Sequence, residues 1–269
     1  MSVQTHLSDL ASSLILSSTE NESIQTSIST LRSRLSDHFG SQVKEQLRFG
    51  SSTRFTMLPR KADEEADVDY MVIFDNTADL KPQTFIDRLK RFAEAKYSRS
   101  DIYQSHPTIV LELNHIKFEL VPAYKDWFGN IYIPATSGYM NWMSTDPNGF
   151  NDSLTNKNQG NDYLIKPMIR LMKYWNAQND YVYESYELEK AIVNASYMWC
   201  KNLRDYFFEG IDDLPTWNLS SQLKKDRVQR AKDLMNKIKQ LESDGYPASA
   251  AVEIQKLVPS LSSVSSYMR

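Results

Sequence analysis

The segment from Asp67 to Phe74 constrains this chain most, because two acids on alternate positions open an otherwise apolar run. Successive side chains of an extended strand point to opposite faces, so Asp67 and Asp69 project together. The apolar residues between and after them project the other way. Two carboxylates about 7 Å apart on one face can share a pair of divalent ions.

A third acid is expected on a neighbouring strand, since such a site needs one more carboxylate. Glu119 lies between apolar residues in the segment 116–123, and another apolar run covers residues 108–113. The dipeptide Asn114-His115 joins the two runs, which predicts a β-hairpin. This hairpin would present Glu119 beside the two aspartates.

The order of these motifs resembles a known family. A Gly-Ser turn at Gly50-Ser51, the Asp-x-Asp strand, and an acid in a strand ending Val-Pro-Ala resemble the DNA polymerase beta type nucleotidyltransferases. Residues 171–176 and 185–189 resemble helical-lobe motifs of the branch that holds bacterial cGAS/DncV-like nucleotidyltransferases (CD-NTases), oligoadenylate synthases and animal cyclic GMP-AMP synthase. The matches extend from about residue 50 to residue 186, and their joint order is more specific than any one of them.

The resemblance implies a site with two Mg²⁺ ions, or Mn²⁺ in their place. Asp67, Asp69 and Glu119 would be the catalytic residues and the metal ligands. The two aspartates would bridge the ions, and Glu119 would ligate the ion that activates the acceptor hydroxyl, or act itself as the base. The family commonly has Asp where Glu119 stands, so the longer side chain could shift the metal or change the preferred metal.

The resemblance also implies a nucleotide site. Gly50 and Ser51 would cradle phosphates, because glycine allows close approach of the backbone and a helix N-terminus favours anions. Lys173 would neutralise the triphosphate, Ser185 would hydrogen-bond it, and Tyr186 would stack on the donor base. Taken alone, Lys173 would be interpreted as an exposed helix lysine and Tyr186 as a core aromatic residue.

Composition narrows the class of protein. The chain has 269 residues and one cysteine, Cys200, so neither an intrachain disulfide nor a cysteine-rich zinc ribbon can form. No apolar run approaches the ~20 residues that span a bilayer, and the N-terminus lacks a signal pattern. We therefore expect a cytoplasmic protein with no membrane partner.

The charge pattern argues against a nucleic-acid platform. The net charge is −3 and the pI is near 5.9. The most basic segment, residues 224–239, carries apolar residues at helical spacing, which predicts a helix whose basic side chains face water. A polyanion site on this segment is the alternative interpretation.

Periodicity and turn signals predict an α+β fold with two lobes. Residues 1–135 would form a nucleotidyltransferase lobe, a small mixed sheet with an N-terminal spine helix and a helix at 82–97. Residues 136–269 would form a helical lobe, with helices at 162–178, 185–208 and 221–241. The stretch 134–160 looks like a crossing between lobes, and Asn156, Asn158 and Asn161 in and after it could offer amide contacts to a base.

The function implied by the resemblance is the joining of ribonucleoside triphosphates into a cyclic di- or trinucleotide, with release of pyrophosphate. The product would activate a downstream effector in bacterial anti-phage defence of the CBASS type, and the protein would act as a monomer. The alternatives are a linear nucleotidyltransferase, which tails RNA or transfers a nucleotide as a toxin does, and a non-catalytic nucleotide sensor. Fold alone does not choose between them.

Overall fold

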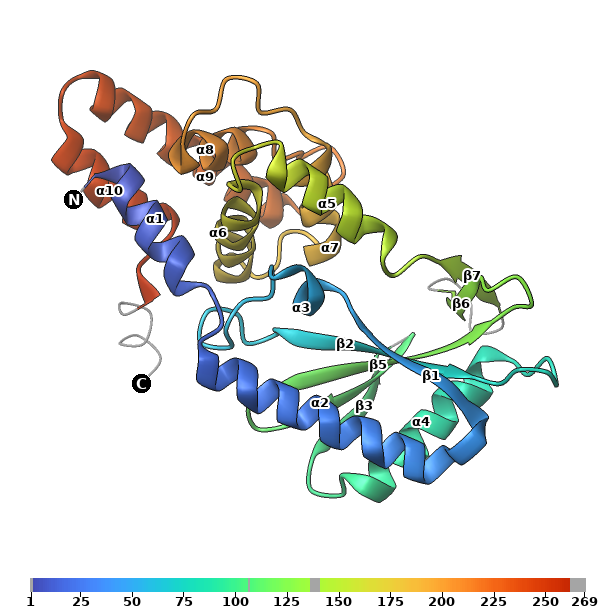
Figure 1. Cartoon of the computed structure of the whole chain (residues 1–269). Coiled ribbons are helices and arrows are strands. Elements are labelled where there is room, and N and C mark those ends of the chain that lie inside the picture. Colours follow the sequence, from blue (N-terminus) through green and yellow to red (C-terminus); the bar gives the residue numbers. More distant parts are fainter. Residues whose placement is uncertain (1, 106, 136–140, 262–269) are drawn as a thin grey trace. The chain divides into compact units, whose positions relative to one another are not determined.

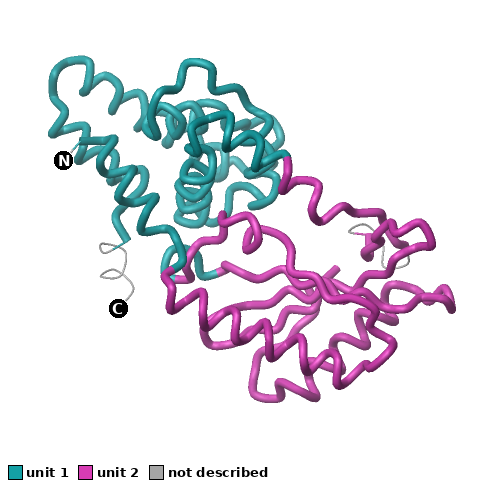
Figure 2. The backbone as a smooth tube through the Cα atoms, viewed as in Figure 1, with its two compact units in different colours: residues 1–16, 61–64, 153–269 teal, residues 17–60, 65–152 magenta. Residues whose placement is uncertain are grey.

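The computed structural model describes residues 2–105, 107–135 and 141–261 (Figure 1). These residues divide into two compact units (Figure 2). One unit contains residues 17–60 and 65–152, and the other contains residues 1–16, 61–64 and 153–269. The sequence analysis placed a single boundary after residue 135. In the structure, the first 16 residues instead group with the C-terminal helices.

The first unit, here called the sheet unit, holds a seven-stranded sheet within the described residues. Its strands are β1 (Val43–Phe49), β2 (Asp67–Phe74), β3 (Asp101–Ser105), β4 (Thr108–Glu112), β5 (Lys117–Lys125), β6 (Ile131–Pro134) and β7 (Trp142–Thr145). The order is β1-β2-β5-β4-β3, and β6 joins β5 to β7. The β2 and β5 pair is parallel and the other pairs are antiparallel, so the predicted mixed sheet is confirmed.

The helices of the sheet unit are α2 (Ser18–Phe39), the short α3 (Ser51–Arg54) and α4 (Pro82–Lys96), and the 3₁₀ turn Gly40–Gln42 follows α2. α2 begins with a capping box: Ser17 Oγ accepts from Glu20 N, and Glu20 Oε2 accepts from Ser17 N. α4 begins with a proline, which suits the first helical position.

α2 and α4 cover one face of the sheet. The ring of Phe74 on β2 lies 5.1 Å from the rings of both Phe39 of α2 and Phe85 of α4. Val68, Tyr70 and Phe74 of β2 are buried. Because alternate residues point to opposite faces, Asp67 and Asp69 are left on the other face, as the alternation predicts.

The second unit, here called the helical unit, contains α1 (Val3–Ser13), α6 (Ile165–Gln178), α7 (Ser185–Asn194), α8 (Leu203–Asp212), α9 (Gln222–Ser243), α10 (Pro247–Leu257) and most of α5 (Gly149–Gln159). α6 runs through its core, and Trp175 is 1% exposed, which confirms its expected packing role. Among the helices of the described residues, none is long and apolar enough to cross a bilayer.

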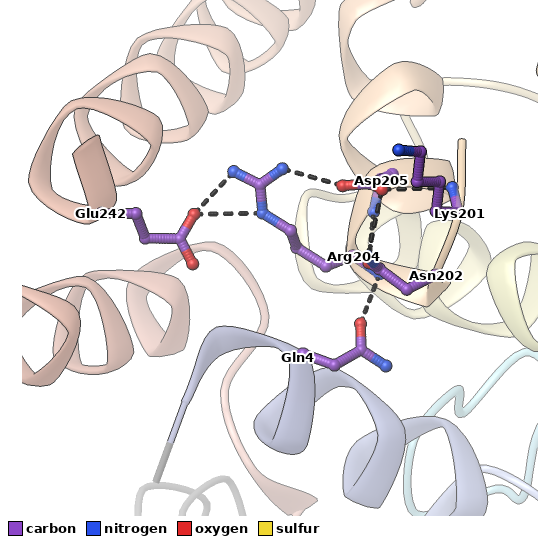
Figure 3. Close-up of polar contacts among 6 residues, drawn as sticks. All are labelled: Gln4, Lys201, Asn202, Arg204, Asp205 and Glu242. Carbon is purple, nitrogen blue, oxygen red and sulfur yellow. Dashed lines mark hydrogen bonds and ion pairs between the residues drawn. The ribbon is translucent and has the colours of Figure 1, made fainter. Parts of the chain in front are cut away.

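A polar network ties three helices of the helical unit together (Figure 3). The Arg204 guanidinium of α8 donates to Glu242 Oε2 of α9 at 2.6 and 3.0 Å, and to Asp205 Oδ1 at 2.9 Å. The backbone N–H of Arg204 donates to Gln4 Oε1 of α1 at 2.8 Å. α1 is thereby attached to helices about 200 residues further along the chain.

The chain passes from the sheet unit to the helical unit after residue 152, inside the stretch 134–160 where a crossing between lobes was predicted. This stretch also contains strand β7 and helix α5, and its residues 136–140 lie outside the described part. Another predicted segment was wrong in part. The helix predicted over 185–208 is two helices. The first ends at Asn194, and Asn202 caps the second by accepting from Asp205 N. Such a cap starts a new helix, which the apolar spacing alone does not show.

Candidate active site

The parallel pairing of β2 and β5 brings the expected acids together. Asp69 lies in register with Glu119, and Asp67 lies in register with Lys117. Neighbouring strands are about 4.8 Å apart, so residues in register on one face are direct neighbours. Asp67, Asp69 and Glu119 therefore share the sheet face opposite α2 and α4. Glu119 is reached through the predicted hairpin of β4 and β5, whose antiparallel pairing is confirmed.

Gly50 packs directly against Asp69. Its φ is +71°, and a Cβ added there would lie 1.7 Å from Asp69 Oδ2. An L side chain would meet the carboxylate in addition to the strain of a left-handed backbone. Only glycine lets the turn and the acid occupy these positions together.

Ser51 follows Gly50 as the first residue of α3. Its carbonyl accepts from Thr56 N and Met57 N, which closes the turn. Within the described residues the Ser51 hydroxyl has no hydrogen-bond partner, whereas Ser52 Oγ donates to Phe49 O at 3.1 Å. Ser51 is therefore the serine of this turn whose hydroxyl is available to a ligand.

Lys117 and Glu65 lie next to the predicted acids, and the sequence motifs did not indicate either of them. Lys117 Nζ is buried and donates to Glu65 Oε2 at 2.6 Å. Burial works to lower the pKa of the Lys117 ammonium. The hydrogen bond to Glu65 and the charges of Asp67 and Glu119 outweigh it and raise that pKa. Lys117 thus offsets the repulsion between the carboxylates.

The donor set suits a hard divalent cation, since Mg²⁺ and Mn²⁺ prefer carboxylate oxygens. A lysine ammonium beside Asp67 and Glu119 shows that this face accommodates positive charge. Among the described residues, however, no three His, Cys, Asp or Glu side chains form a preformed metal-binding group. The two-ion site thus stays a prediction.

Lys173 lies on α6 of the helical unit and was expected to face a triphosphate. Its side chain is 6% exposed, and Nζ donates to Glu189 Oε1 of α7 at 3.3 Å. Glu189 itself is 1% exposed. Removing one partner of such a pair leaves a buried charge uncompensated, at a cost of about 3–5 kcal/mol. A substitution of Lys173 alone would therefore test folding as well as binding.

Ser185 and Tyr186 begin α7. The Tyr186 side chain is 49% exposed, so it is not a core aromatic residue. Lys173, Ser185 and Tyr186 all belong to the helical unit, whereas Gly50, Ser51 and the three acids belong to the sheet unit.

Two of the three asparagines suggested from the sequence, Asn158 and Asn161, are used within the fold, whereas Asn156 is exposed. Asn158 Oδ1 accepts from Lys166 N at 3.0 Å, and Asn161 Oδ1 accepts from the Tyr206 hydroxyl at 3.1 Å. Both amides hold the connection between α5 and α6. They are therefore poor candidates for base recognition.

Comparison with known proteins identifies the family. Residues 1–158 match the Second Messenger Oligonucleotide or Dinucleotide Synthetase domain. The match covers more than half of the chain, so this protein belongs to that family. This confirms the resemblance seen in the sequence, and the enzyme class of the family is nucleotidyltransferase.

A curated relative supports the same assignment. The probable cyclic nucleotide synthase IK1_05630 of Bacillus cereus (strain VD146) is 30% identical over 104 residues. That region is 37% of this chain and 31% of the relative. The match therefore spans about a third of the relative's length.

Solved structures show the same fold. The structure of E. coli MS115-1 CdnC with ATP has a TM-score of 0.69 at 12% identity, and the match covers 96% of this chain and 98% of that one. Vibrio cholerae DncV, a cyclic AMP-GMP synthase, has a TM-score of 0.72 at 13% identity, with 92% of each chain covered. At these identities the likeness shows the fold, and the predicted α+β nucleotidyltransferase fold is confirmed.

Proposed function

We propose that this protein is a metal-dependent nucleotidyltransferase that joins ribonucleoside triphosphates into a cyclic di- or trinucleotide and releases pyrophosphate. The observation that carries the proposal is the register of Asp69 with Glu119 on the face that also bears Asp67, with Gly50 packed on Asp69. Three carboxylates beside a glycine turn, in a member of a second messenger synthetase family, favour nucleotidyl transfer.

Asp67, Asp69 and Glu119 would hold two Mg²⁺ or Mn²⁺ ions. When bound, these ions would stabilise the negative charge that develops on the attacking and departing oxygens. Glu119 lies beside Asp69. It would accept the proton of the acceptor hydroxyl directly, or hold the ion that helps to release this proton.

The phosphates of the donor would contact the Gly50-Ser51 turn. The Ser51 hydroxyl is available there, and Gly50 has no side chain to obstruct a close approach. Ser185, Tyr186 and Lys173 of the helical unit would complete the nucleotide site. For Lys173 to neutralise a triphosphate, its ammonium must either contact both Glu189 and the ligand or break its hydrogen bond to Glu189.

Membership of a second messenger synthetase family supports a proposal for the biological setting. A cyclic product would act as a second messenger on an effector protein, in anti-phage signalling of the CBASS type. The alternatives, a linear nucleotidyltransferase and a non-catalytic sensor, differ from this proposal in their products and not in their fold.

Product analysis tests the proposal. The purified protein is incubated with all four ribonucleoside triphosphates and Mg²⁺ or Mn²⁺, treated with phosphatase and examined by mass spectrometry. A phosphatase-resistant cyclic product is expected. Linear products would favour tailing or toxin activity, and absence of turnover with either metal would contradict catalysis by this chain.

The acids are tested by Asp67→Asn and Asp69→Asn. Each change removes a charge placed to hold a cation, so pyrophosphate release should fall by at least about 100-fold. Asp75→Asn is the matched control, because Asp75 directly follows β2 and pairs with Lys44 at the surface. Its turnover should match that of the unmodified protein. Retained turnover in the Asp67 and Asp69 variants would show that neither acid takes part in catalysis.

A further inference from the structure

Lys117 lies among acids on the sheet face of the candidate active site. On one side it is in register with Asp67 of β2, and on the other side with Glu112 of β4. Glu119 follows two residues later on β5, so its side chain shares the face of Lys117. One ammonium group therefore has three carboxylates beside it, on three neighbouring strands.

The ammonium forms an ion pair with none of these three carboxylates. Lys117 Nζ donates to Glu65 Oε2 at 2.6 Å, and within the described residues this is its only ion pair. Glu112 has another partner, because the Arg60 guanidinium donates to its Oε1 at 2.9 Å. The other two carboxylates act on the ammonium through their charge, without a hydrogen bond to it.

Glu65 lies at the end of the acid face, in the turn that directly precedes β2. Its side chain is 61% exposed, whereas that of Lys117 is 8% exposed. A buried ammonium needs a partner, since a lone buried charge is costly. Without Glu65, the ammonium would be left with the carboxylates beside it on the sheet, two of which are expected to hold the metal ions.

An ammonium that pairs with metal ligands competes with the metal. Divalent ions and ammonium groups are attracted to the same carboxylate oxygens, and like charges a few ångströms apart repel each other. An ammonium paired with Asp67 or Glu119 would have to be displaced before a divalent ion could bind. The pair with Glu65 avoids that step, although the nearby positive charge still weakens the attraction for an ion.

We propose that Glu65 is a positioning residue that keeps the Lys117 ammonium off Asp67 and Glu119, and that Lys117 lowers the affinity of the acids for divalent cations. This inference rests on the metal site of the proposed function. The two residues should then affect metal affinity in opposite directions, which an ion pair with a purely structural role would not do.

The test is titration of the full chain with Mn²⁺, in which the electron paramagnetic resonance signal of the free ion is measured. Lys117→Met removes the charge and keeps most of the apolar stem, so Mn²⁺ binding should tighten roughly tenfold or more. Glu65→Gln should weaken Mn²⁺ binding to a similar degree, because Lys117 then pairs with the acids. Glu64→Gln is the matched control at the neighbouring exposed acid, and it should change the affinity by less than about twofold.

The double variant separates the positioning effect from the charge of Glu65 itself. In a Lys117→Met background there is no ammonium to redirect, so Glu65→Gln should change Mn²⁺ affinity by less than about threefold. An equal loss in both backgrounds would show that only the charge of Glu65 matters, and would overturn its positioning role. Weaker Mn²⁺ binding in Lys117→Met would also overturn the proposal.

Lys117→Arg tests charge against packing, because it keeps the positive charge in a different shape. It should bind Mn²⁺ as the unmodified protein does, and thermal melting of each variant confirms that it is folded at the titration temperature. If Lys117→Arg tightened Mn²⁺ binding as much as Lys117→Met does, the charge of Lys117 would have no part in metal affinity.

The two acids of β2 keep this proposal distinct from the proposed function. Asp67→Asn combined with Asp69→Asn should abolish Mn²⁺ binding, and binding retained there would contradict the metal site itself. Abolished binding in that variant, together with unchanged affinity in Lys117→Met and Glu65→Gln, would overturn this proposal alone. Absence of Mn²⁺ binding by the unmodified protein would overturn both.

Discussion

At the scale of single residues, Gly50 meets two requirements of the candidate active site, one from its backbone conformation and one from its contact with Asp69. Its left-handed φ and its contact with Asp69 are separate constraints, and both are met only without a side chain. Gly129 has a left-handed φ of +86° in the same unit but open space around its Cα. Comparison of the two glycines therefore separates backbone strain from displacement of the carboxylate.

We expect Gly50→Ala to reduce pyrophosphate release about 100-fold or more, because the methyl group displaces the Asp69 carboxylate by an ångström or so. Gly129→Ala should cost about 1–2 kcal/mol of stability from its backbone conformation and leave turnover unchanged. Steady-state turnover and thermal melting of both variants provide the measurements. Equal turnover in the two variants would show that the contact with Asp69 does not matter.

Cys200 permits a prediction about pH. Burial, with the charges of Glu209 and Asp205, raises the pKa of its thiol from 9.0 to about 11. The folded protein at pH 8 should then carry roughly 100-fold less thiolate than an unfolded chain, since two pKa units separate the states. Reaction with a disulfide reagent should be slower by that order in the native state and should accelerate in denaturant. Equal native and denatured rates would contradict the shift.

At the scale of elements, α9 holds the loop between α6 and α7. Lys224 Nζ donates to the carbonyls of Tyr181 and Val182 at 2.8 and 3.2 Å. Asp180 and Tyr181 both have φ near +50°, a conformation that L residues avoid. The expectation that the basic residues of this helix only face water was therefore wrong for Lys224, as it was for Arg227.

Lys224→Met should loosen this loop, because it removes the ammonium and keeps most of the apolar stem. Losing hydrogen bonds from a charged group costs about 1.5–3 kcal/mol, so hydrogen exchange at residues 181–183 should accelerate roughly tenfold or more. The KM for nucleotide should rise, since the loop leads into Ser185 and Tyr186. Lys225→Met is the matched control. Unchanged exchange and KM in Lys224→Met would show that the loop does not need this contact.

At the scale of the whole molecule, the two ends of the chain belong to one unit. The buried residues Val3, Leu7 and Leu10 of α1 contribute to the core of the helical unit. His6 Nε2 lies 2.8 Å from Val258 O, a hydrogen bond that joins residues 252 positions apart. In chain order, the residues of the sheet unit thus come after α1 and before the remaining helices of the helical unit.

Leu7→Ala should destabilise the protein by about 2–5 kcal/mol despite its position near the N-terminus, because Leu7 is fully buried and its loss leaves a cavity. Ser12→Ala lies on the exposed side of the same helix and should change stability by less than about 0.5 kcal/mol. Denaturant unfolding of both variants makes the comparison. A small effect of Leu7→Ala would show that α1 is only loosely attached.

The sequence by itself determined the features whose signals are local. The alternation in residues 67–74 placed Asp67 and Asp69 on one face, and the dipeptide Asn114-His115 predicted the hairpin that carries Glu119. Both were confirmed, because a strand has a period of two and a short turn sets the register of its hairpin.

The tertiary structure alone decided what depends on distant parts of the chain. The Lys173 pair with Glu189, the Lys224 contacts with the loop before α7, and the grouping of α1 with the C-terminal helices all join residues far apart in sequence. A side chain's hydrogen-bond partner and burial are set by whatever the fold packs against it. Composition and periodicity describe only the segment to which that side chain belongs.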